Sequence, residues 1–336
     1  MTVLPLCLGC SGARGDPPPP PVCADQKRLA CTGLYALAGI EAYEPGFRLW
    51  SDGLDKARYV YLPPGSRIDT GDMDEWVFPV GTKFWKEFRW RGKRVETRFL
   101  EKTATDAWRR TTFVWNADES DAREELAGKT VTLDGGHGPY DVPGEQDCGR
   151  CHGGRRDDIL GFEALALGAP GASGLTLQRL VAARRLTHAP AAAASAVPGT
   201  ALDRSALGWL HMNCGVSCHN SSPSAGASFA GLNLKLSTSG PADPRQTATL
   251  RTSLNQPTTA LGFRDPSAPK IRIVPGRPRE SAIYFRTRSR TPALSMPPLA
   301  THLVDHEAVA MLERWIAALA DAPTAGPASA GVRPPQ

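Results

Sequence analysis

Two short cysteine motifs constrain this chain more than any other feature of its sequence. The segment DCGRCH (147–152) has two residues between its cysteines, NCGVSCH (213–219) has three, and in both a histidine directly follows the second cysteine. Cys-x-x-Cys-His is the signature of c-type haem attachment. The two thiols form thioethers with the haem vinyl groups, and the adjacent histidine is placed to ligate the iron. A chain that carries such a group must fold so that a large apolar ligand fits beside each motif.

The second motif has one residue more than the signature. The extra residue lies between the thiols and can be taken up as a local bulge in the turn, while the Cys-His adjacency that sets the iron ligand is kept. We therefore predict two covalently attached haem c groups. In each proximal histidine the other ring nitrogen should donate to a backbone carbonyl, which fixes the tautomer. The predicted attachment residues are Cys148 and Cys151 with His152 for the first haem, and Cys214 and Cys218 with His219 for the second.

Three other uses of the paired cysteines compete with haem. Structural zinc would leave two adjacent histidines unexplained, a redox pair of the thioredoxin type lacks a surrounding strand–helix–strand pattern, and ordinary disulfides are the third option. A distant element favours haem. Met296 lies in a Pro-rich loop just before an amphipathic helix expected over 305–320, and cytochromes c present a thioether to the iron from such a loop. We predict Met296 as the sixth ligand of the second haem, which tends to raise its potential.

These motifs carry a resemblance to known proteins. Residues 200–320 resemble a class I-like bacterial cytochrome c domain, through LHMNCGVSCHN, IVPGRPRESAIY and SMPPLATHLVDHEAVAMLERWI. The stretch from YEPGFRLWSDGLDKARYVYLPPG through EWVFPVGTKFWKEF to DCGRCH is similar to a family of exported dihaem c-type cytochromes with a β-rich N-terminal region. The resemblance spans residues 43–320 and implies electron transfer outside the cytoplasm. The chain departs from the family pattern at the three-residue gap of its second motif.

The sixth ligand of the first haem distinguishes an electron carrier from a haem enzyme. No second Met-Pro-Pro loop exists, so the candidates are His211, in the helix before the second motif, and His137, in a Gly-rich loop before Cys148. Ligation by either histidine predicts an electron carrier, which is the function that we expect. An open sixth position predicts a peroxidase-like haem enzyme instead. A third possibility is a redox or binding module that docks to a periplasmic dehydrogenase or a carbohydrate.

The predicted fold class is α+β, with a β-rich, sandwich-like N-terminal domain followed by a mainly α-helical, cytochrome c-like haem region. Alternating residues predict a hairpin from KFWKEFRW and RVETRFLEK, and six of the eight tryptophans lie within residues 50–115. Helices are expected over 174–186 and, with Asp203 as a cap, before the second motif. The predicted divisions are a signal remnant and Pro-rich tether (1–24), a β-rich domain (25–147), the first haem segment with a linker (148–198), the cytochrome c-like domain (199–322) and a disordered tail (323–336).

The N-terminal residues favour export. The segment MTVLPLCLGCSGARGDPPPPP is similar to the end of a bacterial lipoprotein signal, with Cys10 as the lipidated residue and the prolines as a tether. Cys23 and Cys31 are eight residues apart in the part that would be exported, so we predict a disulfide between them. The expected location is the bacterial periplasm or cell surface, with peripheral membrane attachment through the lipid.

Charge and hydropathy exclude some partners and favour one. The net charge of +5 is too small to indicate nucleic-acid binding, and the sequence has no basic-aromatic repeat that would support it. No apolar run reaches the length of a membrane helix. Seven cations crowd into residues 270–290 near the second motif. This basic segment either is a solvated face, or neutralises haem propionates and docks an acidic redox partner protein.

Overall fold

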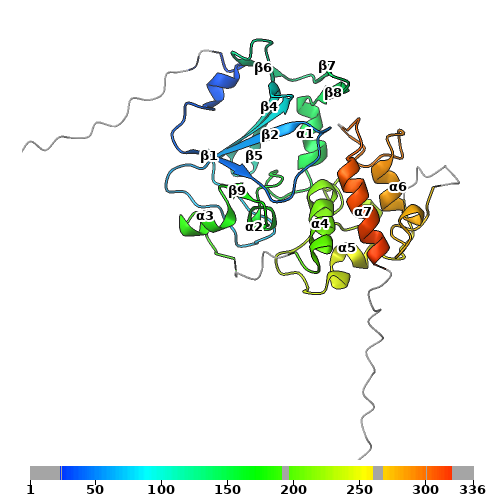
Figure 1. Cartoon of the computed structure of the whole chain (residues 1–336). Coiled ribbons are helices and arrows are strands. Elements are labelled where there is room, and N and C mark those ends of the chain that lie inside the picture. Colours follow the sequence, from blue (N-terminus) through cyan, green and yellow to red (C-terminus); the bar gives the residue numbers. More distant parts are fainter. Residues whose placement is uncertain (1–22, 24, 191–196, 260–267, 300, 320–336) are drawn as a thin grey trace, which may run out of the picture.

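The computed structural model describes residues 23, 25–190, 197–259, 268–299 and 301–319. An antiparallel N-terminal sheet of seven strands is followed by a region of several short helices, so the fold class is α+β (Figure 1). Strand order in the sheet is β6-β5-β4-β3-β2-β1-β9. The strands are β1 (Ile40–Glu44), β2 (Asp55–Tyr61), β3 (Lys83–Trp90), β4 (Lys93–Ala104), β5 (Ala107–Trp115), β6 (Ala122–Glu125) and β9 (Ser173–Gly174), and β7 (Lys129–Leu133) pairs with β8 (Gly138–Val142) as a separate hairpin.

The β3–β4 hairpin confirms the strand prediction from alternating residues. Its turn residues Arg91 and Gly92 both have positive φ, at 50° and 81°, which is the conformation that a tight two-residue hairpin turn requires. The predicted sandwich is not what forms, however. Within the described ranges the strands make one large sheet and one two-stranded hairpin. Strand β9, from the segment after the first motif, pairs with β1 and extends the large sheet.

Both faces of the sheet are covered. One face packs on the 3-10 helix Leu29–Thr32, where the hydroxyl of Thr32 accepts a 2.8 Å hydrogen bond from the indole of the buried Trp85. The opposite face packs, through Phe84 among others, against Phe162 and the helices α2 (Ala164–Gly168) and α3 (Leu177–Ala182). The segment that follows the first cysteine motif is therefore part of the layer that covers the sheet.

The C-terminal region is built on two helices that pack against each other, α4 (Ala201–Leu210) and α7 (His306–Ala318). Leu207, Leu312 and Ile316 are fully buried between them, and the indole of Trp315 donates a 2.9 Å hydrogen bond to Asp203. These contacts confirm the apolar stripe predicted for the terminal helix. The remaining helices are α1 (Glu145–His152), α5 (Ala248–Arg251) and α6 (Ala282–Arg288).

Two predicted helix boundaries were wrong. The cap of α4 is Thr200, whose hydroxyl accepts from the backbone of Asp203 while the Asp203 carboxylate accepts from the backbone of Thr200. This reciprocal pair is a capping box, which uses the acidic residue at the third helical position. The helix expected over 174–186 is shorter, because Gly174 and Arg184 have positive φ and end the regular backbone on both sides of α3.

The structure contains the disulfide Cys23–Cys31, with 5.4 Å between the two Cα atoms. Disulfides persist in oxidising compartments, so this bond fits a protein outside the cytoplasm. No helix within the described part of the chain is long and apolar enough to cross a membrane. The predicted lipidation site Cys10 and the predicted disordered tail lie outside the described residues.

Candidate haem-attachment site

The first cysteine motif lies on α1, which ends at His152. Nδ1 of His152 donates to the backbone carbonyl of Asp158, so Nε2 is the nitrogen left for a ligand, as predicted for a proximal histidine. Burial lowers the pKa of His152 to about 4, although the Asp158 carbonyl acts in the opposite direction. The imidazole is thus held in the neutral form, which is the form that ligates metals.

The second cysteine motif begins in a wide helical turn. Residues His211–Gly215 form a π-helix directly after α4, and the backbone N–H of Val216 donates to the carbonyl of His211 over 2.8 Å. The N–H of His219 likewise donates to the carbonyl of Cys214, five residues earlier, over 2.8 Å. An α-helix would close this ring over four residues. The same Cys214 carbonyl also accepts from the N–H of Cys218, four residues on, over 3.2 Å. A five-residue ring within the motif fits the local bulge predicted for the extra residue.

The two motifs are in direct contact. The hydroxyl of Ser217, inside the second motif, donates a 2.7 Å hydrogen bond to the carbonyl of Cys151 in the first. Gly154 packs so closely on the same turn that a Cβ there would lie 2.0 Å from the Ser217 carbonyl oxygen. At Gly226 a Cβ would lie 3.7 Å from the Arg150 carbonyl and 3.8 Å from the Cys218 sulfur. Segments more than sixty residues apart thus form one site.

The thiols lie in half-buried positions that favour the neutral form. Burial raises the pKa of Cys148 and Cys151 and raises that of Cys214 to about 12, and the thiol of Cys218 adds to the shift at Cys151 and Cys214. All four are free cysteines. Among the described residues no three His, Cys, Asp or Glu side chains are grouped so as to hold a metal ion.

The histidine predicted as the second proximal ligand, His219, differs from His152. Nδ1 of His219 is buried and has no hydrogen-bond partner in the described part of the chain, so the predicted carbonyl partner was wrong for this residue. Burial and the charges of Arg286 and Arg272 lower the pKa of His219 to about 4. Neither His219 nor His152 uses its Nε2 in a hydrogen bond to a described residue. The free Nε2 atoms beside half-buried thiols fit the requirements of c-type haem.

Met296 lies in a loop that Arg286 fastens to α6. The backbone N–H of Met296 donates to the Arg286 carbonyl over 3.0 Å, and the Arg286 guanidinium donates to the carbonyls of Leu294 and Ala293, each over 3.1 Å. The charge of Arg286 also contributes to the lowered pKa of His219, so this arginine lies near the second motif as well as holding the Met296 loop.

His211, one of the two candidates for the first iron, has both ring nitrogens engaged. Nδ1 accepts a 3.0 Å hydrogen bond from the backbone of Leu236, and Nε2 donates to the buried carboxylate of Glu163. Burial would raise the pKa of Glu163, but Arg155 and His211 hold it well below its usual value. His211 therefore links the second motif to the segment after the first and has no lone pair left for iron.

His137, the other candidate, keeps one lone pair. Its Nε2 donates to the carbonyl of Asp52 over 2.8 Å, its ring packs edge-on against Trp90, and its Nδ1 is buried without a partner among the described residues. Of the two candidates, only His137 has a free nitrogen in this arrangement.

The basic segment 270–290 is largely structural. Arg272, Arg286 and Arg290 each donate to backbone carbonyls of neighbouring loops, and Arg277 pairs with Glu280. These arginines join loops around the second motif rather than presenting a uniform charged face. The exposed members of the segment are Lys270, Arg277, Arg279 and Arg288.

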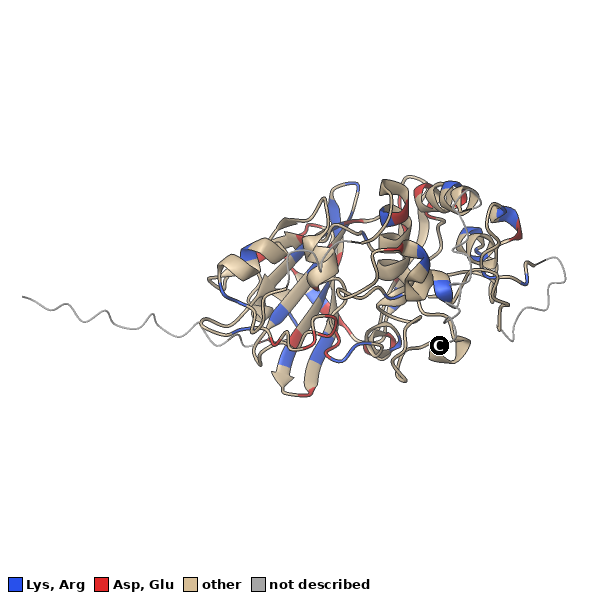
Figure 2. Cartoon of the chain, turned by 90° about the horizontal axis from the view of Figure 1, so that it is seen from below, with Lys and Arg blue, Asp and Glu red and all other residues tan. Residues whose placement is uncertain are grey.

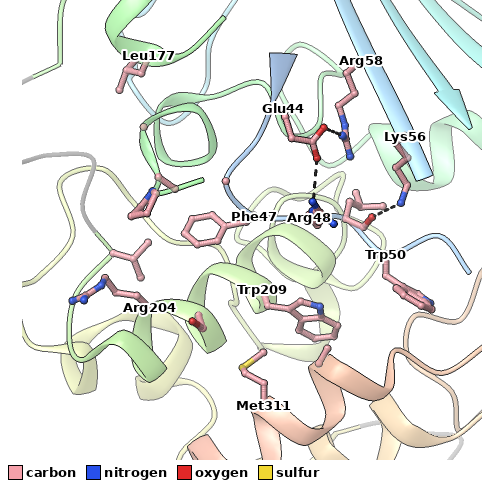
Figure 3. Close-up of a pocket in the computed structure, with 18 of the residues that line it drawn as sticks. Glu44, Phe47, Arg48, Trp50, Lys56, Arg58, Leu177, Arg204, Trp209 and Met311 are labelled. Atoms are coloured by element: carbon pink, nitrogen blue, oxygen red, sulfur yellow. Dashed lines mark hydrogen bonds and ion pairs between the residues drawn. The ribbon is translucent and has the colours of Figure 1, made fainter. Parts of the chain in front are cut away.

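A cleft of about 1540 Å³ lies between the β1–β2 edge of the sheet and the helices α3, α4 and α7. Figure 3 shows Glu44 between Arg58 and Arg48, with Trp209 beside Met311 on the opposite wall. None of the motif cysteines or histidines lines this cleft. The indoles of Trp90, Trp108 and Trp115 donate hydrogen bonds to other groups of the chain.

Sequence reasoning missed the residues that join the two motifs. Ser217, Gly154 and Glu163 have no local signature, although a serine between the motif cysteines and a glycine pair after the first motif are visible in the sequence. Their roles depend on contacts across the fold. The chain matches no protein-family model, no curated protein and no solved structure.

Proposed function

We propose that the protein is a dihaem c-type cytochrome that transfers electrons outside the cytoplasm. The observation that carries the proposal is the direct contact between two Cys-His turns, in each of which a histidine whose Nε2 bonds no described residue directly follows a free cysteine. Two groups attached at touching turns would form a short relay within one chain. The α4–α7 packing next to the second motif supports a cytochrome c-like C-terminal domain.

The proposed location is the bacterial periplasm or cell surface, with a lipid on Cys10 as the membrane attachment. The disulfide Cys23–Cys31 supports the oxidising compartment but not the anchor. The proposed partner is another redox protein. The arginines that remain exposed in segment 270–290 would favour docking to an acidic face of that partner.

In this function the chain's own residues hold and orient the cofactor. A bound haem supplies a one-electron couple at its iron. The Asp158 carbonyl fixes the ring orientation of His152. In the second motif, the hydrogen bond from the His219 N–H to the Cys214 carbonyl holds the histidine against the turn that carries the cysteines. The hydrogen bond from Ser217 to Cys151 fixes the two attachment turns relative to each other. Positioning of this kind is the part of the task that the protein supplies.

The test is a haem count on the exported chain. Expression with a working export signal and haem maturation machinery should give a mass increase of two haems, and a pyridine haemochrome spectrum should give the same stoichiometry. Replacing Cys148 and Cys151 by Ala should remove one haem, and replacing Cys214 and Cys218 should remove the other. A chain with zinc and no haem would defeat the proposal, and a single haem would show that the wide-turn motif is not used.

Replacing Met296 by Ala should remove the weak methionine-to-iron charge-transfer band and lower the potential of the second haem. The thioether stabilises reduced iron, so its loss favours the oxidised form. The haem should remain attached, because its thioether bonds involve only Cys214 and Cys218. Met311 on α7 is a matched control, and Met311→Ala should leave the band unchanged. An unaltered spectrum in Met296→Ala would rule out this ligand.

A second candidate function is a peroxidase-like enzyme with an open position on the first iron. The observation that favours it is the engagement of both nitrogens of His211. A high-spin first haem that binds cyanide and turns over peroxide would establish the enzyme. A low-spin first haem that becomes high-spin in His137→Ala would instead establish an electron carrier with His137 as ligand.

A further inference from the structure

A row of like charges crosses the middle of the sheet. Arg58 on β2 lies opposite Lys86 on β3, and Lys86 lies opposite Arg98 on β4, so three cations are direct cross-strand neighbours on one face. Lys56, two residues from Arg58, is on the same face. Figure 2 shows Lys and Arg in blue along the strands of the sheet. We call Lys56, Arg58, Lys86 and Arg98 the cationic row.

The cationic row lies between two apolar clusters. On one side of the row Val60 and Phe84 belong to the core beneath α2 and α3, and on the other side Phe88 packs with Tyr140 beneath the β7–β8 hairpin. Arg58 is buried and Lys56, Lys86 and Arg98 are half-buried, and charged side chains are rarely enclosed in such surroundings unless they are paired. Like charges placed directly opposite each other are also destabilising. The row therefore needs a compensating anion.

The described residues supply only part of that compensation. Arg58 pairs with Glu44, and Arg98 pairs with Glu96 at 2.6 Å, while Lys56 donates only to backbone carbonyls. Lys86 has a cation–π contact with Phe88 at 5.2 Å but no hydrogen bond or ion pair with any residue that the structure describes. Four cations thus face two carboxylates, which leaves two positive charges without an anionic partner.

The electrostatic effect of this excess is visible at the lysines. Burial, followed by the charges of Arg58, Lys56 and Arg98, lowers the pKa of Lys86 well below its usual value. Burial also lowers the pKa of Lys56 to about 8, again with Arg58 and Arg98 contributing. Both lysines are therefore held in positions where a nearby anion would stabilise their charged form.

The cationic row adjoins the first cysteine motif. Helix α1 packs on β5, the strand next to β4. Arg98 acts electrostatically on Cys148 and Cys151, and Lys86 acts on His152. Arg110 of β5 pairs at 2.5 Å with Asp158, whose carbonyl holds His152. The unpaired positive charge therefore lies on the side of the sheet where the first haem would be attached.

We propose that the cationic row, with Lys86 at its centre, binds the two propionates of the haem attached at Cys148 and Cys151. The inference rests on the proposed function and adds the contacts that orient the first haem. A dicarboxylate carries the two negative charges that the row lacks. Charge-assisted hydrogen bonds from Lys and Arg to carboxylates are among the strong ones in proteins. Residues of the sheet, rather than of the basic segment 270–290, are thereby assigned to this haem.

The experiment is a redox titration of the dihaem protein and of Lys86→Met. A positive charge near the haem favours the reduced form, so its removal should lower the reduction equilibrium constant of the first haem about tenfold, or about 59 mV for one electron. The second haem should keep its potential, and the mass should still show two haems. Lys83→Met, on the same strand but the opposite face, is the matched control and should change neither potential.

Lys86→Arg keeps the charge and should keep the potential of the first haem near that of the unaltered protein, which separates a charge effect from a packing effect. If Lys86→Met does not accumulate as folded protein, Arg98→Met tests the same row with the same expected direction. An unchanged potential in a Lys86→Met protein with both haems would overturn the assignment. A change of the first haem from low to high spin would also overturn it, because it would place the amine on the iron. Absence of haem at Cys148 and Cys151 in the unaltered protein would instead defeat the proposed function itself.

Discussion

Replacing Lys102 by Met should lower the free energy of unfolding by about 3–5 kcal/mol. Lys102 on β4 is 1% exposed, and its ammonium lies 2.7 Å from both carboxylate oxygens of Asp157, which also accepts hydrogen bonds from the Trp108 indole and the Phe78 backbone. Removing the lysine leaves a buried carboxylate without its counter-charge. Asp157 follows the first motif by five residues, so this pair fastens the haem-attachment segment to the sheet.

Denaturant unfolding followed by tryptophan fluorescence measures this change. Lys93→Met, at the exposed start of the same strand, should stay within about 0.5 kcal/mol. The double replacement of Lys102 by Met and Asp157 by Asn should regain part of the lost stability, because no uncompensated charge remains. A loss below about 1 kcal/mol in Lys102→Met would mean that water or another cation reaches Asp157.

Gly154→Ala should destabilise the contact between the two cysteine motifs by about 2–3 kcal/mol. The new Cβ would lie 2.0 Å from the Ser217 carbonyl oxygen, which is backbone and cannot rotate away. The two turns must separate, and the hydrogen bond from Ser217 to Cys151 should weaken with them. Thermal unfolding of the haem-loaded protein gives the size of the loss, and protection of the Ser217 region from proteolysis shows where it occurs.

Gly149→Ala is the control within the same motif helix. No atom lies within 4 Å of its Cβ position, and alanine is favoured over glycine inside a helix by about 0.5–1 kcal/mol. This variant should therefore be neutral or slightly more stable. Equal stability of Gly154→Ala and Gly149→Ala would contradict the contact between the motifs.

Local patterns in the sequence were enough to predict several elements. The β3–β4 hairpin and α7 follow from strict alternation and from a 3.6-residue apolar stripe, both of which are set by neighbouring residues. A local bulge at the second motif could also be expected, since the extra residue lies between two cysteines while the histidine still directly follows the second of them. These features depend on spacing alone.

The relations between distant segments could not be predicted in this way. His211 has helical neighbours in sequence, but its role depends on Glu163, forty-eight residues earlier. The sheet gained β9 from a segment that has no strand pattern of its own. One signal for the cationic row was present, because Lys86 lies between Phe84 and Phe88 at alternate positions of an apolar strand face. Its register with Arg58 and Arg98 became visible only in the sheet.

The wide turn at Cys214 has a consequence for how such motifs are aligned. In an α-helix one added residue rotates everything after it by about 100°. Here the Cys214 carbonyl accepts from both Cys218 and His219, so the inserted residue is accommodated within a single turn that ends at the histidine. A gap placed here in an alignment would mark one added residue within that turn. Spacing patterns that allow two or three residues between the cysteines would therefore group chains that a fixed pattern separates.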